Sequence, residues 1–258
     1  MSRRRSISSA ENRGPKLRLD QLLVRRGLAE SRQKAQALVM AGAVDVAGVR
    51  VDKPGQAVSA SAEISLRSSP PFVSRGGLKL AEALRLFDVN VQGKTVMDVG
   101  ASTGGFTDCL LQNGASRVIA VDVGHGQFHW TLRNDPRVRL LEKTNIRHLT
   151  PRTLGEPAQG AVIDVSFISL KIVVPAVSRL LEPGAFMVTL VKPQFEVGRK
   201  RVGKGGVVRD PVLHEEVLRE LSSVFLDQGW TVLDRAASPI LGPRGNREFL
   251  LHLERSRP

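Results

Sequence analysis

The segment VMDVGASTGGF, residues 96–106, decides the fold class, because an apolar run leads into a glycine-rich turn and then into a helical pattern. Strand-like and helix-like patterns alternate after it, which predicts an α/β fold with a doubly wound, Rossmann-like sheet. In such a sheet the turn lies over the crevice where ligands bind. Ser102 stands where a GxGxxG motif has its second glycine, which argues against a cradle for pyrophosphate.

Acidic residues near this turn indicate a nucleoside ligand. The next predicted strand ends in VDVG, and Asp122 lies where a carboxylate accepts hydrogen bonds from the two ribose hydroxyls. Asp98 precedes the first turn and suits a positively charged cofactor such as S-adenosylmethionine. Asn145, after a third strand, is placed to flank an adenine. The alternative is that these acids only cap helices in tight connections.

Seven strands are predicted in this region, with helices between them. The expected strands are residues 95–99, 117–122, 138–141, 161–165, 185–191, 231–235 and 248–253. The clearest helix start is Asp210 followed by Pro211, an N-cap acid and a proline at the first helical position. We assign this domain to residues 74–254.

Residues 17–66 form a separate basic module. Two short helical patterns, each ended by a glycine, precede short strand-like segments. The stretch RLDQLLVRRGLAESRQKAQALVMAGAVDVAGVRVDKPGQAV, residues 18–58, resembles the small RNA-binding domain named after ribosomal protein S-four. The resemblance implies that Arg18 and Arg32 dock on structured RNA, since arginine suits bidentate phosphate contact. A solvated helical face is the alternative interpretation of these charges.

Composition and charge limit the classes of binding partner and the cellular compartment that we expect for this chain. The 258 residues include 38 Lys and Arg against 25 Asp and Glu, a net charge of +13, which indicates nucleic acid or an anionic membrane surface. The single cysteine excludes a disulfide framework, so the cytoplasm is expected. No apolar run is long enough to span a bilayer. We expect a disordered basic arm over residues 1–16, not a secretory signal, and a linker over residues 67–73.

Further motifs identify a family. DVGASTGG with VDVG is similar to the Rossmann-type methyltransferases, and LRNDPRV, TNIR, DVSFISL, LVKPQFEVG, GGVVRDP and SPILGPRGNREF together resemble the TlyA family, also known as haemolysin A. The catalytic domain of that family is similar to FtsJ-type RNA ribose methyltransferases. The resemblance implies S-adenosylmethionine-dependent 2'-O-methylation of cytidines in ribosomal RNA, within ribosomal subunits. The expected cofactor-binding residues are Asp98, Gly100, Ser102, Thr103, Gly104, Asp122, Asn145 and Asp164.

The resemblance also implies a catalytic set. The Lys-Asp-Lys-Glu residues of FtsJ-type enzymes map onto Lys79, Asp164, Lys192 and Glu248. We assign Lys192 as the base or orienting group for the target hydroxyl, with the other three tuning and positioning it. The methyl group of the sulfonium is already activated, so no metal is expected. Lys143 and Arg147 are expected to contact RNA near the cofactor.

Several other interpretations can be weighed against the sequence. Amine methylation usually goes with an Asn/Asp-Pro-Pro-aromatic loop, which is missing at residues 164–167, and Cys109 fits a core position better than a nucleophile. GRKRVGK, residues 198–204, resembles a P-loop only in part, and a mobile basic loop that closes on RNA fits it better. His125 and His129 lack a third zinc ligand nearby. A membrane-active haemolysin and an RNA-binding ribosome assembly factor without catalysis are the rival functions.

Overall fold

The computed structural model describes residues 15–40, 42–66, 71–198 and 201–255. The chain divides into two compact units, residues 1–70 and residues 71–258. Residues 1–14 of the expected arm and residues 67–70 of the expected linker lie outside the described residues. Lys16 already belongs to a strand of the first unit, and the Val73 N–H donates to Asp108 in the second, at 2.8 Å. The two units therefore extend slightly into the segments that the sequence assigned to the arm and the linker.

The N-terminal unit is built on two short helices. Its elements are β1 (Lys16–Arg18), α1 (Leu19–Arg25), α2 (Arg32–Met40), β2 (Val44–Val46), β3 (Val49–Arg50), β4 (Ala57–Ser59) and β5 (Ile64–Leu66). Antiparallel pairing joins β1 to β4 and joins β2 to both β3 and β5. Leu19, Leu22 and Leu23 of α1 pack against Ala35 and Val39 of α2. These spacings repeat with the helical period, which is why the sequence pattern located both helices.

The larger unit contains one seven-stranded sheet among the described residues, in the order β11-β12-β10-β9-β6-β7-β8. The strands are β6 (Thr95–Val99), β7 (Arg117–Val121), β8 (Val138–Leu141), β9 (Ala158–Ile163), β10 (Leu181–Val191), β11 (Trp230–Ala237) and β12 (Phe249–Arg255). Strands β6 to β10 run parallel, whereas β12 is antiparallel to both of its neighbours. The α/β fold class is confirmed, and each predicted strand overlaps an observed one, although β9 begins before residue 161 and ends before residue 165, and β10 begins before residue 185.

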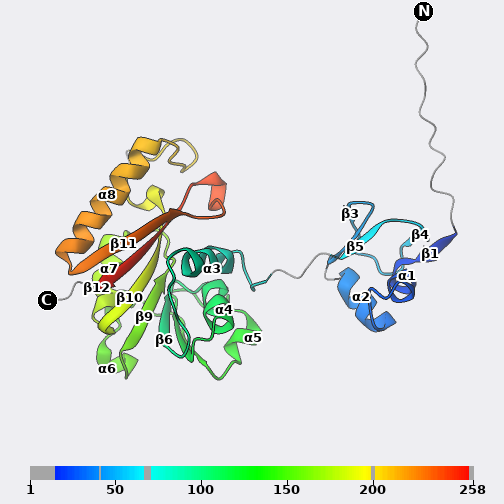
Figure 1. Ribbon diagram of the computed structural model, residues 1–258, viewed down its shortest axis with the longest axis horizontal. Helices are drawn as coiled ribbons and strands as arrows, with labels where there is room; N and C mark the ends of the chain where they lie inside the picture. Colours follow the sequence, from blue (N-terminus) through cyan, green and yellow to red (C-terminus); the bar gives the residue numbers. More distant parts are fainter. Residues whose placement is uncertain (1–14, 41, 67–70, 199–200, 256–258) are drawn as a thin grey trace, which may run out of the picture. The chain divides into compact units, whose positions relative to one another are not determined.

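Helices cover both faces of this sheet (Figure 1). They are α3 (Gly76–Leu86), α4 (Gly105–Gln112), α5 (Trp130–Arg133), α6 (Pro151–Leu154), α7 (Leu170–Ser178) and α8 (Pro211–Asp227), with short 3-10 turns η1 (Ile146–His148), η2 (Pro193–Phe195) and η4 (Pro243–Gly245). Val96 of β6 packs in the layer formed with α3 and α4, whereas Met97 and Val99 pack in the layer formed with α7 and α8. None of the helices in the described ranges is long and apolar enough to cross a membrane.

The topology fixes where a ligand can bind. The chain leaves β6 toward β7 on one side, while β9 pairs with β6 on the other side. The strand order therefore reverses at β6, and the carboxyl ends of β6 and β9 flank a crevice of the kind that binds ligands in open α/β sheets.

Candidate active site

The glycine-rich turn after β6 lies at this crevice. Gly100 has a φ of +89°, and a Cβ atom added there would come within 2.3 Å of the Asp164 carbonyl oxygen. Only glycine permits both this left-handed backbone and the close approach to the end of β9. Gly104, with a φ of +98°, then caps the start of α4. The turn is thus held tightly against the residue that follows β9.

A cavity of about 490 Å³ opens beside this turn, and its lining fits a nucleoside. Asp122 accepts hydrogen bonds from the N–H groups of Ser102 and Gly124, both at 2.7 Å. Each carboxylate oxygen has a second lone pair, so both can still accept from ribose hydroxyls. Further lining comes from Gly100, from the polar residues Asn145 and Asp164, and from an apolar wall of Ile146, Val165, Ile168 and Val173. This combination of a carboxylate with an apolar wall suits the adenosine part of S-adenosylmethionine.

Three of the residues predicted to bind the cofactor do not line the cavity. The Asp98 side chain is fully buried toward α4, where it accepts a hydrogen bond from Thr107 at 2.7 Å. Burial raises the pKa of Asp98 to about 7, although the hydrogen bond from Thr107 opposes the shift. Thr103 and Gly104 are also absent from the lining, in which Ser102 takes part. These three residues shape the turn from the side facing α4 and α5.

The structure brings the four predicted catalytic residues together as two ion pairs. Lys79 Nζ lies 2.6 Å from Glu248 Oε2, and Lys192 Nζ lies 2.5 Å from Asp164 Oδ1. Lys192 also donates to the Ser166 hydroxyl at 3.0 Å. Lys79 is in the first turns of α3, Asp164 and Lys192 directly follow β9 and β10, and Glu248 directly precedes β12. Parallel strands place their carboxyl ends at one edge, which explains why such distant residues meet.

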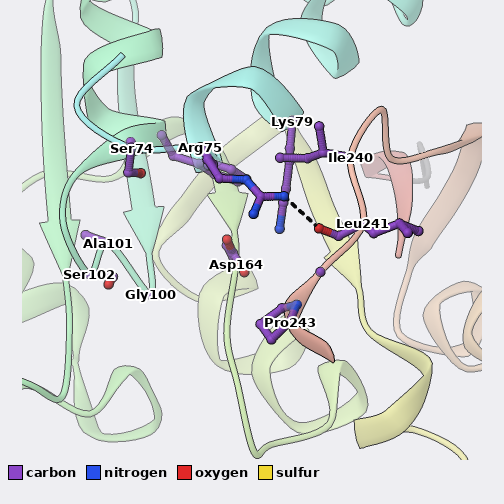
Figure 2. A pocket seen from close by; sticks show the side chains of 14 residues that line it. Ser74, Arg75, Lys79, Gly100, Ala101, Ser102, Asp164, Ile240, Leu241 and Pro243 are labelled. Carbon is purple, nitrogen blue, oxygen red and sulfur yellow. Dashed lines mark hydrogen bonds between the residues drawn. The ribbon is translucent and has the colours of Figure 1, made fainter. Parts of the chain in front are cut away.

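A second cavity connects the two ion pairs to the glycine turn. It has a volume of about 260 Å³, and Lys79, Asp164, Gly100 and Ser102 all contribute to its lining. Figure 2 shows the Lys79 side chain pointing into this pocket, with Asp164 below it. Lys192 itself lines neither cavity, but it contacts Asp164, which lines both.

Sequence reasoning missed two prominent side chains at these cavities. Arg75 lines the smaller one and donates to the Leu241 carbonyl oxygen at 3.1 Å, which ties the start of α3 to the loop before β12 (Figure 2). Phe167 lines the larger one with 91% of its surface exposed, a φ of +64°, and its ring 5.0 Å from that of Phe195. The signal for Phe167 was an aromatic residue in the polar loop DVSF, directly after a predicted strand.

The residues predicted to bind RNA lie on both units. Lys143 and Arg147 are exposed and flank Asn145 at the rim of the larger cavity. Arg18 and Arg32 lie in the N-terminal unit, where both guanidinium groups bind the carboxylate of Asp20.

The expected mobile basic loop is anchored over part of its length. Asn246, which is buried, accepts the Val208 N–H at 3.1 Å and donates to the Gly206 carbonyl oxygen at 3.0 Å. Arg244 donates to the Gly205 carbonyl oxygen at 3.2 Å. Free movement of residues 205–208 therefore does not fit the structure, and residues 199–200 lie outside its described part.

The two remaining motifs have structural explanations. The His129 side chain accepts the Thr131 N–H and caps α5. Across the ranges that the structure describes, no group of three or more His, Cys, Asp or Glu residues is arranged to hold a metal ion. Cys109 is fully buried, and burial raises its pKa to about 12, which makes the thiol a poor nucleophile.

Comparisons with known proteins agree with this site. Residues 72–255 match the FtsJ-like methyltransferase family, and residues 17–64 match the S4 domain. The Bacillus subtilis protein YqxC is 51% identical over 92% of this chain and 85% of its own. The 16S/23S rRNA (cytidine-2'-O)-methyltransferase TlyA of Mycobacterium tuberculosis is 48% identical over 92% of this chain and 89% of its own. A solved structure from Streptococcus thermophilus, named as a haemolysin, has a TM-score of 0.72 and 46% identity over 94% of this chain and 89% of its own.

The family match covers most of the chain and includes all four residues of the two ion pairs, and the cavity beside them has the lining that an adenosine needs. The chain therefore belongs to the FtsJ-like, S-adenosylmethionine-dependent methyltransferases of the TlyA type.

Proposed function

We propose that this chain methylates the 2'-hydroxyl of cytidines in ribosomal RNA within ribosomal subunits. The observation that carries the proposal is the pair of lysine–carboxylate contacts at the end of the sheet, next to a cavity with a ribose-binding carboxylate. The relatives that match over most of the chain include one named for this reaction on 16S and 23S rRNA. Ribosomal RNA as substrate also implies action in the cytoplasm.

Each residue of the ion pairs has a distinct task in this reaction. S-adenosylmethionine supplies an activated methyl group on a positively charged sulfur. Lys192 orients the target hydroxyl and accepts or delocalises its proton, while Asp164 and Ser166 hold the amine in place. Lys79 lines the smaller cavity together with Asp164, and the buried carboxylate of Glu248 fixes its amine. None of these steps requires a metal ion.

RNA docking is assigned to residues 17–66, and the methyl transfer to residues 74–254. The match to the S4 domain and the exposed arginines of that unit support this division. Removing residues 1–66 is expected to weaken RNA binding far more than S-adenosylmethionine binding. Equal RNA affinity without these residues would contradict the division.

The decisive experiment follows the methyl group. The chain is incubated with radiolabelled S-adenosylmethionine and with small or large ribosomal subunits from cells that lack this gene, and the RNA is then hydrolysed with alkali. A 2'-O-methyl group removes the nucleophile for strand cleavage, so the label should remain in resistant dinucleotides. Label in ordinary mononucleotides would mean base methylation, and RNA binding without any label would favour the assembly-factor function.

A further inference from the structure

The N-terminal unit contains an acidic residue that is buried beneath two half-exposed arginines. Asp20 is fully buried, and its side chain forms hydrogen bonds with two arginines and one glutamine. A negative charge beside these arginines weakens their attraction to the phosphates of RNA. The presence of Asp20 at this position therefore needs a physical explanation.

The contacts of Asp20 are specific in geometry. Arg18 binds it with two nitrogens, Nε to Oδ1 at 3.1 Å and Nη2 to Oδ2 at 3.0 Å. Arg32 binds Oδ2 through Nε at 3.0 Å, and Gln36 donates to the same oxygen at 3.0 Å. Since Arg18 Nη2 and Arg32 Nε both lie 3.0 Å from one oxygen, they are at most twice that distance apart. One carboxylate therefore holds two positive groups side by side that would otherwise repel each other.

The two arginines remain available to a ligand. Their side chains are 46% and 54% exposed, while the Asp20 side chain beneath them has no exposed surface. Within the described residues, Nη1 and Nη2 of Arg32 and Nη1 of Arg18 have no hydrogen-bond partner in the protein. These remaining donors suit the oxygens of a phosphodiester.

We propose that Asp20 is a positioning residue for RNA binding, which holds Arg18 and Arg32 together as a clamp for one phosphodiester group. The inference rests on the proposed function, since RNA is its partner. It assigns a role to an acidic residue within the RNA-binding unit and predicts that the two arginines act jointly. A purely structural tie between α1 and α2 is the competing explanation.

Substitution of Asp20 tests the proposal in one measurement. Loss of its negative charge alone would strengthen RNA binding, whereas loss of the arginine positions that it holds would weaken RNA binding. Asp20→Asn and Asp52→Asn each remove one negative charge from the same unit, and Asp52 is exposed. Affinity of the full chain is measured by fluorescence anisotropy with a labelled fragment of ribosomal RNA over a salt series. Asp20→Asn should weaken binding on the order of tenfold and lower the salt slope by about one, while Asp52→Asn leaves binding unchanged or tighter. Equal or tighter binding by Asp20→Asn would overturn the proposal.

A milder variant covers the case in which Asp20→Asn disturbs folding. Gln36→Leu keeps the carboxylate and both arginines but removes one hydrogen bond to Oδ2. It should lower RNA affinity by a smaller factor, at an unchanged melting temperature of the chain. Unchanged RNA affinity of Gln36→Leu would also overturn the proposal.

Double variants test whether Asp20 acts through the arginines. If one phosphate is shared, Arg18→Ala and Arg32→Ala each lower the salt slope by about one, and their combination lowers it little further. Asp20→Asn should then add little to the loss caused by Arg32→Ala. Additive losses would mean that Asp20 supports RNA binding only by holding the fold together.

The failure of this inference differs from the failure of the proposed function. A chain that bound no ribosomal RNA would overturn both. A chain that bound and methylated ribosomal RNA, and did so equally well with Asp20→Asn, would overturn the clamp alone.

Discussion

Lys79 Nζ lies 2.6 Å from Glu248 Oε2, although 169 positions separate these residues in the chain. The two side chains are 10% and 0% exposed, so the ion pair is almost free of water. The loop before β12 closes over it, since a Cβ atom at Gly242 would lie 2.0 Å from Glu248 Oε1. Arg75 ties the same loop to α3 through Leu241. This pair therefore connects the first helix of the larger unit to the residue that precedes its last strand.

Breaking this pair should cost both stability and activity. Lys79→Met or Glu248→Gln leaves one buried charge without its partner, which is expected to lower the free energy of unfolding by about 3 kcal/mol. Urea unfolding and methyl transfer to ribosomal subunits check the two effects. In the double variant Lys79→Met with Glu248→Leu, stability should largely return while methyl transfer stays lost. Retained methyl transfer in that double variant would remove the pair from the catalytic machinery.

Lys192 is expected to act in the chemical step. Lys192→Ala should lower kcat by at least about 100-fold while S-adenosylmethionine binds with unchanged affinity, since this lysine does not line the cavity that suits adenosine. Lys94→Ala, at the opposite end of β6, is the matched control and should keep normal turnover. Lys192→Arg separates two roles, because arginine stays protonated and cannot accept a proton. Near-normal turnover of Lys192→Ala in a folded chain would refute the assignment.

Phe167 contributes to the lining of the larger cavity, but 91% of its surface is exposed, so its ring is expected to support the target nucleotide outside the adenosine site. An aromatic face beside the active site can stack on a base that has left its helix, and such stacking contributes about 1–3 kcal/mol. Phe167→Ala should therefore raise KM for ribosomal RNA roughly tenfold or more, while Phe167→Trp keeps most of the activity. Steady-state kinetics with RNA and S-adenosylmethionine varied separately give the comparison. A change confined to the KM for S-adenosylmethionine would place Phe167 in the cofactor site instead.

Much of the fold follows from local sequence signals. The strands of the larger unit are short apolar runs bounded by glycine, proline or acids, and these signals survive in a single sequence. The two helices of the N-terminal unit were found because their leucines repeat with the helical period. The boundaries of the two units are harder to predict from the sequence, because Lys16 and Val73 are held by contacts with residues far along the chain.

The site was predictable in its members but not in its contacts. The resemblance to FtsJ-type enzymes identified Asp164 and Lys192, and in the structure both follow apolar strands whose carboxyl ends share one edge. The pairing of particular lysines with particular carboxylates depends on strand order, which no local pattern encodes. Asp98 illustrates the same limit. Both faces of β6 are buried, so an apolar run of this kind does not indicate on which face the Asp98 side chain meets Thr107.

Titration of Asp98 makes the stability of the larger unit depend on pH. Burial raises its pKa in the folded chain to about 7, whereas an unfolded chain loses this proton near its usual pKa of about 4. Between these values the folded state binds more protons, so the contribution of Asp98 to stability falls as pH rises and is lost above about pH 7.

Asp98→Asn removes the titration. Its melting temperature should match that of the unmodified chain near pH 4 and exceed it increasingly up to pH 8, as measured by thermal unfolding in a pH series. Thr107→Val, which removes the hydrogen bond that favours the ionised form, should move the midpoint of the effect to higher pH. A difference between Asp98→Asn and the unmodified chain that stayed constant over this range would show that Asp98 does not titrate there.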